Sequence, residues 1–138
     1  MNQVILIAHG DLAVEMKKSA EMLFGKLDNF HPISFLAEEG LDSLQEKISG
    51  IMEALNSPVL VFTDIFCGTP YNASCSVALK NPQFDMSIIS GMSLPLVLEL
   101  AILINSKSIS EVSEELQKAV VDTVRIFNKD IIDDEEEL

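Results

Sequence analysis

The chain has 138 residues, 48% of them hydrophobic, so it is long enough for one domain with its own core and too apolar to be disordered. Nine Lys and Arg stand against 22 Asp and Glu, and the resulting charge of −13 argues against nucleic-acid binding and favours a basic partner surface. The presence of only two cysteines and the lack of a basic leader predict a reduced, cytoplasmic protein. No apolar stretch reaches about 20 residues, so we expect no membrane span.

Apolar runs alternate with amphipathic stretches along the first third of the chain. Residues 4–8 read VILIA, a short β-branched run that is typical of a parallel strand buried on both faces. A helix is expected to begin near Asp11, with Met16, Ala20 and Leu23 facing inward. Residues 30–36 form a weaker strand.

The middle of the chain repeats this order. Beyond Gly40 the apolar residues lie on one helical stripe, and Pro58 ends that helix. The stripe consists of Leu41, Leu44, Ile48, Ile51, Met52 and Leu55. Residues 59–63 form a second buried strand. Thr69 and Pro70 predict the start of a helix that runs to about Lys80, because Thr caps free N–H groups and Pro fits a first turn.

The last third contains one more strand and two helices. Residues 86–90 form the strand, and residues 94–104 are apolar nearly all round, which predicts a buried helix that also forms a homodimer interface. Ser108 and Glu111 form a capping-box pattern ahead of a final helix. One face of that helix carries Ile109, Val112, Leu116, Ala119, Val120, Val124 and Phe127.

Strands and helices that alternate at this spacing predict an α/β fold. We expect a single domain, residues 1–130, with an open, mostly parallel sheet and helices on both faces in three layers. Residues 131–138 include five consecutive acidic residues, Asp133 to Glu137, and are expected to form a solvated tail.

The candidate chemistry lies where ligands bind such sheets, beyond the carboxyl ends of the strands. His9 follows the first strand and Asp64 the second strong one. A carboxylate that accepts a hydrogen bond from Nδ1 leaves the Nε2 lone pair free to attack, as in a catalytic triad. The helix start at Thr69 supplies N–H groups, a positive dipole end and a hydroxyl, which together favour a phosphate-sized anion.

Simpler interpretations stay open for each of these residues. His9 could be an ordinary loop histidine, Asp64 a turn residue and Thr69 only a helix cap. His31 precedes Pro32 and has no acidic or cysteine neighbour, so we interpret it as structural. The cysteines match no zinc pattern, and we predict no metal and no cofactor.

Three segments, in this order, resemble the IIA component of the mannose-family bacterial phosphotransferase system. The first strand leads into His9 and Gly10, as the family's does. An Asp-Leu-x-Gly-Gly-Ser/Thr-Pro-x-Asn block corresponds to residues 64–72, DIFCGTPYN, and a Gly-x-Asn-Leu-Pro-x-x-x-Glu block to residues 91–99, GMSLPLVLE. The resemblance extends over the whole chain up to the tail.

The resemblance implies that His9 is phosphorylated on Nε2 and that Asp64 orients its ring. Residues of the helix start would hold the phosphoryl oxygens: Gly68, Thr69 and Pro70. The wall of the pocket would consist of Gly10, Phe66, Cys67, Gly91 and Ser93. Members of the family take phosphate from the phosphocarrier HPr and give it to a IIB component, which phosphorylates a sugar as it enters through membrane IIC and IID subunits.

The chain departs from the family pattern in two places and at its end. Cys67 replaces the first Gly of the pair, and Ser93 replaces Asn, without removing a group that the chemistry needs. Some members end in an antiparallel strand exchanged between protomers, whereas after Phe127 this chain offers only Ile131 and Ile132 as apolar residues before its run of acids.

Three rival functions use similar residues. A related IIA-like subunit passes phosphate to a dihydroxyacetone kinase and differs only in its acceptor. Cobalt or iron chelatases of tetrapyrrole synthesis also have a His-Gly after the first strand, but they need a further metal-binding His. Histidine phosphatases have an Arg directly before the His, where this chain has Ala8.

Overall fold

The computed structural model describes residues 1–130, so the predicted tail, residues 131–138, lies outside the described residues. Strands and helices alternate as far as the fourth helix. The elements are β1 Gln3–His9, α1 Leu12–Phe24, β2 Phe30–Phe35, α2 Leu41–Leu55, β3 Val59–Thr63, α3 Thr69–Lys80, β4 Met86–Ile89, α4 Leu94–Leu103 and α5 Ile109–Thr123. Within residues 1–130, no helix is both long and apolar enough to cross a bilayer.

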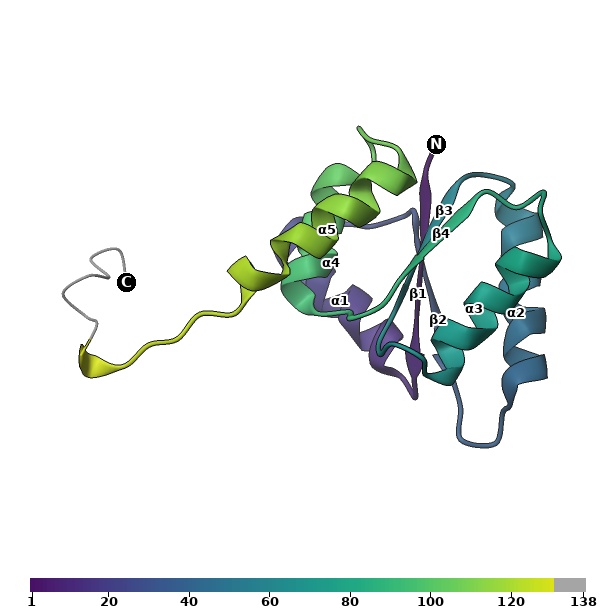
Figure 1. The fold of residues 1–138 in the computed structure, drawn as a ribbon, viewed down its shortest axis with the longest axis horizontal. Helices are drawn as coiled ribbons and strands as arrows, with labels where there is room; N and C mark the ends of the chain where they lie inside the picture. Colours follow the sequence, from purple (N-terminus) through teal and green to yellow (C-terminus); the bar gives the residue numbers. More distant parts are fainter. Residues whose placement is uncertain (131–138) are drawn as a thin grey trace.

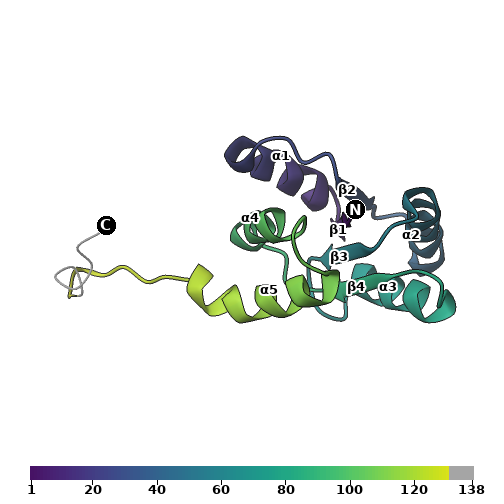
Figure 2. The same cartoon turned by 90° about the horizontal axis from the view of Figure 1, so that it is seen from above.

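The four strands form one parallel sheet in the order β2-β1-β3-β4. Helices α1, α4 and α5 cover one face of the sheet, and α2 and α3 cover the other (Figures 1 and 2). The predicted three-layer α/β fold with a parallel sheet is therefore confirmed. The two inner strands are β1 and β3, which are also the most apolar segments of the sheet.

Strand β1 supplies side chains to both cores, because successive residues of a strand point to opposite faces. Val4, Leu6 and Ala8 belong to the core beneath α1, α4 and α5. Ile5 and Ile7 belong to the core beneath α2 and α3. All five side chains are fully buried, which explains an unbroken apolar run in place of an alternating one.

The apolar pattern of strand β2 is weaker than that of β1 or β3 because β2 lies at the edge of the sheet. Only Phe30 and Ile33 are buried among its six residues. Pro32 has no N–H to donate, and an edge strand tolerates this because one side of its backbone has no neighbouring strand.

The packing differs from the prediction at the ends of two helices. Leu23, expected to face inward, is 66% exposed, and Leu27 in the loop beyond α1 enters the core in its place. Helix α5 ends at Thr123, so Val124 and Phe127 do not lie on it and are exposed. The β-branched residues at this end of α5 lower its helix propensity, since such side chains lose rotamer freedom in helices.

Helix α4 is apolar on most sides because other parts of the same chain surround it. It lies between α1 and α5 (Figure 2), and its buried side chains share a core with those of β1 and β3. Leu96, Val97 and Leu100 are buried in the core, and among the large apolar residues of this helix Ile102 is exposed. The prediction of a dimer interface on this helix therefore loses its basis, since α4 needs no second copy to cover it.

Candidate active site

The site lies at the point where the order of the strands in the sheet reverses. From β1 the chain crosses to β2 on one side, whereas β3 and β4 follow on the other side. Such a switch point leaves a crevice beyond the carboxyl ends of the two inner strands. His9 is the last residue of β1, and Asp64 directly follows β3.

His9 and Asp64 are in direct contact. The ring Nδ1 of His9 lies 2.7 Å from Asp64 Oδ2, and the backbone N–H of His9 donates to the same oxygen at 3.0 Å. A carboxylate only accepts hydrogen bonds, so this contact assigns the ring proton to Nδ1 and the lone pair to Nε2. The side chain of His9 is 48% exposed and that of Asp64 is 11% exposed.

The Asp64 carboxylate is held in its ionised form. Burial alone raises the pKa of this carboxyl, but hydrogen bonds from the His9 backbone and ring and from the Ile65 N–H outweigh it. The net result is a pKa below the ordinary value for aspartate. Asp64 is therefore an anion near neutral pH and can stabilise a positive charge on the neighbouring ring.

The loop between β3 and α3 brings the helix start against the ring. Cys67 has a left-handed backbone, with φ 62°, and the Asn72 side chain donates to its carbonyl at 3.1 Å. Gly68 follows in extended conformation as the N-cap of α3. A Cβ on Gly68 would lie 2.8 Å from Ile65 Cγ1 and 3.3 Å from His9 Cε1, so any larger residue here would displace the Ile65 side chain and press on the His9 ring.

The helix begins one residue earlier than a Thr69 cap requires. Gly68 occupies the N-cap position, where it has no side chain to accept a hydrogen bond. Thr69 is the first helical residue, and Pro70 is the second. First-turn N–H groups have no partners within a helix, and Pro70 has no N–H, so those of Thr69 and Tyr71 remain. Together with the helix dipole and the Thr69 hydroxyl, they suit an anion beside His9.

The segment after β4 also reaches the site. The N–H of Gly91 donates to the Asp64 carbonyl at 3.2 Å, and that of Met92 donates to the Thr63 carbonyl at 3.0 Å. Gly91 has a positive φ of 92°, which favours glycine there. Ser93 caps α4 by accepting a hydrogen bond from Leu96 N–H.

Other predicted wall residues lie at the rim. Gly10 has φ 60° and donates its N–H to the Phe35 carbonyl at 2.8 Å. Phe66 and Cys67 are exposed, and the Phe66 ring makes an edge contact with Tyr71 at a centroid distance of 5.1 Å.

Two neighbours of the site were not singled out from the sequence. Phe35 contacts the His9 ring, and Asn72 holds the loop that precedes α3. Asn72 lies within the block that carries the resemblance, whereas the place of Phe35 follows only from its pairing with His9 across β1 and β2. His31 lies elsewhere on β2, where its Nε2 is 2.8 Å from Gln3 Oε1.

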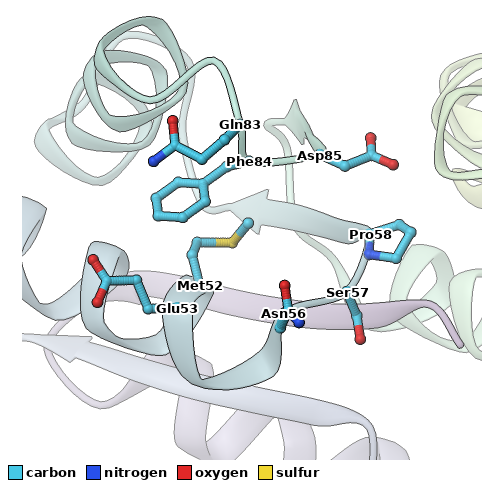
Figure 3. A pocket seen from close by; sticks show the side chains of 8 residues that line it. All are labelled: Met52, Glu53, Asn56, Ser57, Pro58, Gln83, Phe84 and Asp85. Carbon is cyan, nitrogen blue, oxygen red and sulfur yellow. The ribbon is translucent and has the colours of Figure 1, made fainter.

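A hollow at the opposite end of the sheet does not fit an anion. It has a volume of about 540 Å³ and is lined by residues that precede β3 and β4 and by the end of α2. Figure 3 shows Met52 and Phe84 side by side, with the carboxylates of Glu53 and Asp85 on either side. No lysine, arginine or histidine lines it, so a phosphoryl group would find only like charge there. Residues 1–130 contain no cluster of three or more acidic, His or Cys side chains for a metal ion.

Comparison with known proteins settles the family. The family model described as "PTS system fructose IIA component" matches residues 3–117. The chain is also 42% identical to the sorbose-specific EIIA component of Lacticaseibacillus casei over 117 residues, which cover 84% of this chain and 83% of the relative. This chain belongs to the mannose-family IIA components of the phosphotransferase system.

Other relatives agree with this assignment. The IIA component is 33% identical to the fructose-specific EIIA component of Bacillus subtilis (strain 168), with coverage of 98% of this chain and 99% of the relative. The solved mannose/sorbose-specific IIA subunit from Enterococcus faecalis superposes with a TM-score of 0.83 at 28% identity, over 92% of this chain and 95% of the other. A EIIA structure from Streptococcus agalactiae has the same fold, with a TM-score of 0.83 at 20% identity.

The family fixes the general activity. The IIA component is a phosphotransferase and a phosphoryl relay in sugar uptake. The chelatase and phosphatase interpretations are therefore excluded. The relatives named here act in sugar transport, which favours this role over a relay to a dihydroxyacetone kinase.

Proposed function

We propose that His9 is the residue that carries the phosphoryl group, bonded through Nε2. The observation that supports this most is the 2.7 Å contact between Nδ1 and Asp64. It leaves Nε2 as the nucleophilic nitrogen, on a side chain that is exposed enough for a partner protein to reach. An imidazole suits a relay because the N–P bond is weak enough to be passed on.

The transfer step can be written with Nε2 as the attacking atom. The Nε2 lone pair forms a bond to the phosphorus of a phosphohistidine on the donor protein. The donor's N–P bond breaks, and its imidazole nitrogen keeps the electron pair. The His9 ring then bears a positive charge with the proton still on Nδ1, and the Asp64 carboxylate stabilises that charge.

The start of α3 would bind the phosphoryl oxygens. Gly68 lets the helix approach the ring closely, and the Thr69 hydroxyl and the first-turn N–H groups would donate to the oxygens. Phosphoryl transfer depends mainly on positioning and on electrostatic stabilisation of charge spread over these oxygens. Pro70 would fix the first turn, so that these donors are already oriented.

The surface around His9 fits docking of partner proteins. Exposed apolar side chains lie close to site residues along the chain, and the net charge of −13 suits a basic partner. They are Leu12, Leu36, Ile65 and Phe66. We propose that this surface binds HPr and then a IIB component in turn. The protein would act in the cytoplasm and meet the membrane IIC and IID subunits only through that complex.

Intact-mass spectrometry tests the central claim. The protein is incubated with phosphoenolpyruvate, Enzyme I and HPr, and it should gain the mass of one phosphoryl group. The adduct should be labile in acid and stable in alkali. His31→Ala should retain it, and His9→Ala should lose it. No added mass in the native protein, or phosphate retained in His9→Ala, refutes the proposal.

We also propose that the protein is a homodimer, with an interface centred on the end of α5 and the edge strand β4 and not on the length of α4. Large apolar residues at the end of α5 and just beyond it are exposed, on a segment that extends away from the body (Figures 1 and 2). They are Val121, Val124, Ile126 and Phe127. An open groove of about 360 Å³ beside the edge strand β4 includes Ile88, Leu96 and Val120 in its lining. The segment of one copy would fill the groove of the other.

Light scattering at micromolar concentration should give the mass of a dimer. The double variant Val124→Asp, Ile126→Asp should give a monomer, because it places charge in the proposed contact. Met22→Asp, an equally exposed apolar position on α1, should leave the dimer intact. A native monomer would contradict the proposal, as would a dimer unaffected by the double variant.

A further inference from the structure

His9 lies between two side chains that come from the strands on either side of it. Strand β1 has β3 on one side and β2 on the other. Asp64 follows β3 and contacts His9 through Nδ1. Phe35 is the last residue of β2, and its ring centroid lies 5.5 Å from that of His9 with an angle of 76° between the ring planes. This is the edge-to-face geometry that aromatic rings prefer.

Phe35 is itself held firmly. Its Cα pairs with that of His9 in the β1–β2 register, and its carbonyl accepts the Gly10 N–H at 2.8 Å. The ring is half-buried and packs against the core beneath α2 and α3. Phe35 can therefore serve as a fixed surface for the exposed His9 ring.

A single hydrogen bond does not fix an imidazole. The Nδ1 contact with Asp64 holds one atom of the ring, and the two side-chain torsions of His9 can still change together around it. A second contact in another direction removes this freedom. Transfer needs Nε2 aligned with the breaking N–P bond, and small misplacements of a reacting group are costly.

We infer that Phe35 is a positioning residue, which holds the His9 ring so that Nε2 points toward the incoming phosphoryl group. This inference rests on the proposed role of His9. Phe35 touches neither the phosphoryl group nor the reacting atom in this role. It acts only through the orientation of the ring, so its effect belongs to the transfer step and not to binding of the donor.

The test replaces the ring and keeps the backbone contacts. Phe35→Leu keeps an apolar side chain of similar size, and Phe35→Tyr restores the ring. The matched control is Phe84→Leu, because Phe84 is also partly buried against the same core but lies at the far end of the sheet (Figure 3). Each variant is phosphorylated from phospho-HPr, and kcat and KM for phospho-HPr are measured separately.

We expect Phe35→Leu to lower kcat about three- to tenfold with little change in KM, which is the scale of one aromatic contact. Phe35→Tyr should recover most of the rate, and Phe84→Leu should leave it unchanged. In NMR spectra, the His9 ring protons should lose their ring-current shift in Phe35→Leu and retain it in Phe35→Tyr. The ¹⁵N shifts of the His9 ring should indicate a less fixed tautomer in Phe35→Leu.

Three results would overturn the inference: an unchanged kcat in Phe35→Leu, an equal loss in Phe84→Leu, or a change confined to KM. The last would make Phe35 a docking contact for the donor. If the native protein accepts no phosphoryl group at all, the proposed function fails first. A phosphorylated native protein with an unaffected Phe35→Leu variant refutes only the role of Phe35.

Discussion

One oxygen of Asp64 binds His9 twice. Oδ2 accepts the backbone N–H of His9 at 3.0 Å and lies 2.7 Å from its Nδ1, while Oδ1 accepts the N–H of Ile65 at 2.9 Å. The carboxylate therefore joins the end of β1 to the loop after β3 and holds the Nδ1 atom of the imidazole in the same place. Structural and chemical roles are combined in a single side chain.

Asp64→Asn should leave the fold intact and slow phosphoryl transfer by at least about a hundredfold. The amide can hold the wrong imidazole tautomer and cannot stabilise the positive ring. Stopped-flow or quenched-flow kinetics with phospho-HPr measure the transfer rate, and circular dichroism checks the fold. Unchanged transfer in a folded variant would remove Asp64 from the mechanism.

The stability of the native protein should depend on pH through Asp64. Its pKa is lower in the folded state than its ordinary value, so its contribution is fully present above that ordinary value, about 4. The contribution is lost as the pH falls through the lower folded value. The difference in unfolding free energy between the native protein and Asp64→Asn, measured by urea denaturation, should therefore shrink in acid. A difference that stays constant or grows below pH 4 would contradict this.

Gly68→Ala should slow transfer about ten- to a hundredfold, because the new Cβ would press on the Ile65 side chain and on His9 Cε1. Gly50→Ala is the matched control. Gly50 lies within α2 with nothing near a built Cβ, so this change should stabilise the fold by about 0.5–1 kcal/mol and leave transfer unchanged. Transfer at the native rate in Gly68→Ala would show that the ring tolerates displacement.

Thr69→Val removes the hydroxyl and keeps the shape of the side chain. If the hydroxyl donates to the phosphoryl group, the transfer rate should fall about tenfold, on the scale of one hydrogen bond to a charged group. The phosphorylated variant should also lose its phosphate to water at a different rate, which can be followed by intact mass. A variant with native values for both rates would exclude the hydroxyl from the site.

Removal of residues 133–138 should leave transfer nearly unchanged, because we interpret this acidic stretch as solvated charge. Rates with phospho-HPr are compared at low and high salt for the full and shortened chains. A large loss at low salt that high salt abolishes would show instead that the tail attracts a basic partner.

The order of elements could be predicted because it depends on local patterns. The run from Val4 to Ala8 is apolar at every position, and only a strand covered on both faces requires this. The capping box of Ser108 and Glu111 fixed the start of α5 for the same local reason. Helix ends were less predictable, as Leu23 and Val124 show, because their burial depends on what lies beyond the helix.

The sequence by itself determined the α/β fold and the family. It also placed His9 and Asp64 at strand ends and Thr69 at a helix start, since short local motifs carry each of these features. Only the tertiary structure decided that Gly68 lies close to the Cε1 atom of His9 and that Phe35 contacts the His9 ring. It also decided that α4 is covered by its own chain. These relationships depend on which strands become neighbours and on how side chains fill the space between elements, and neither is encoded in any one segment.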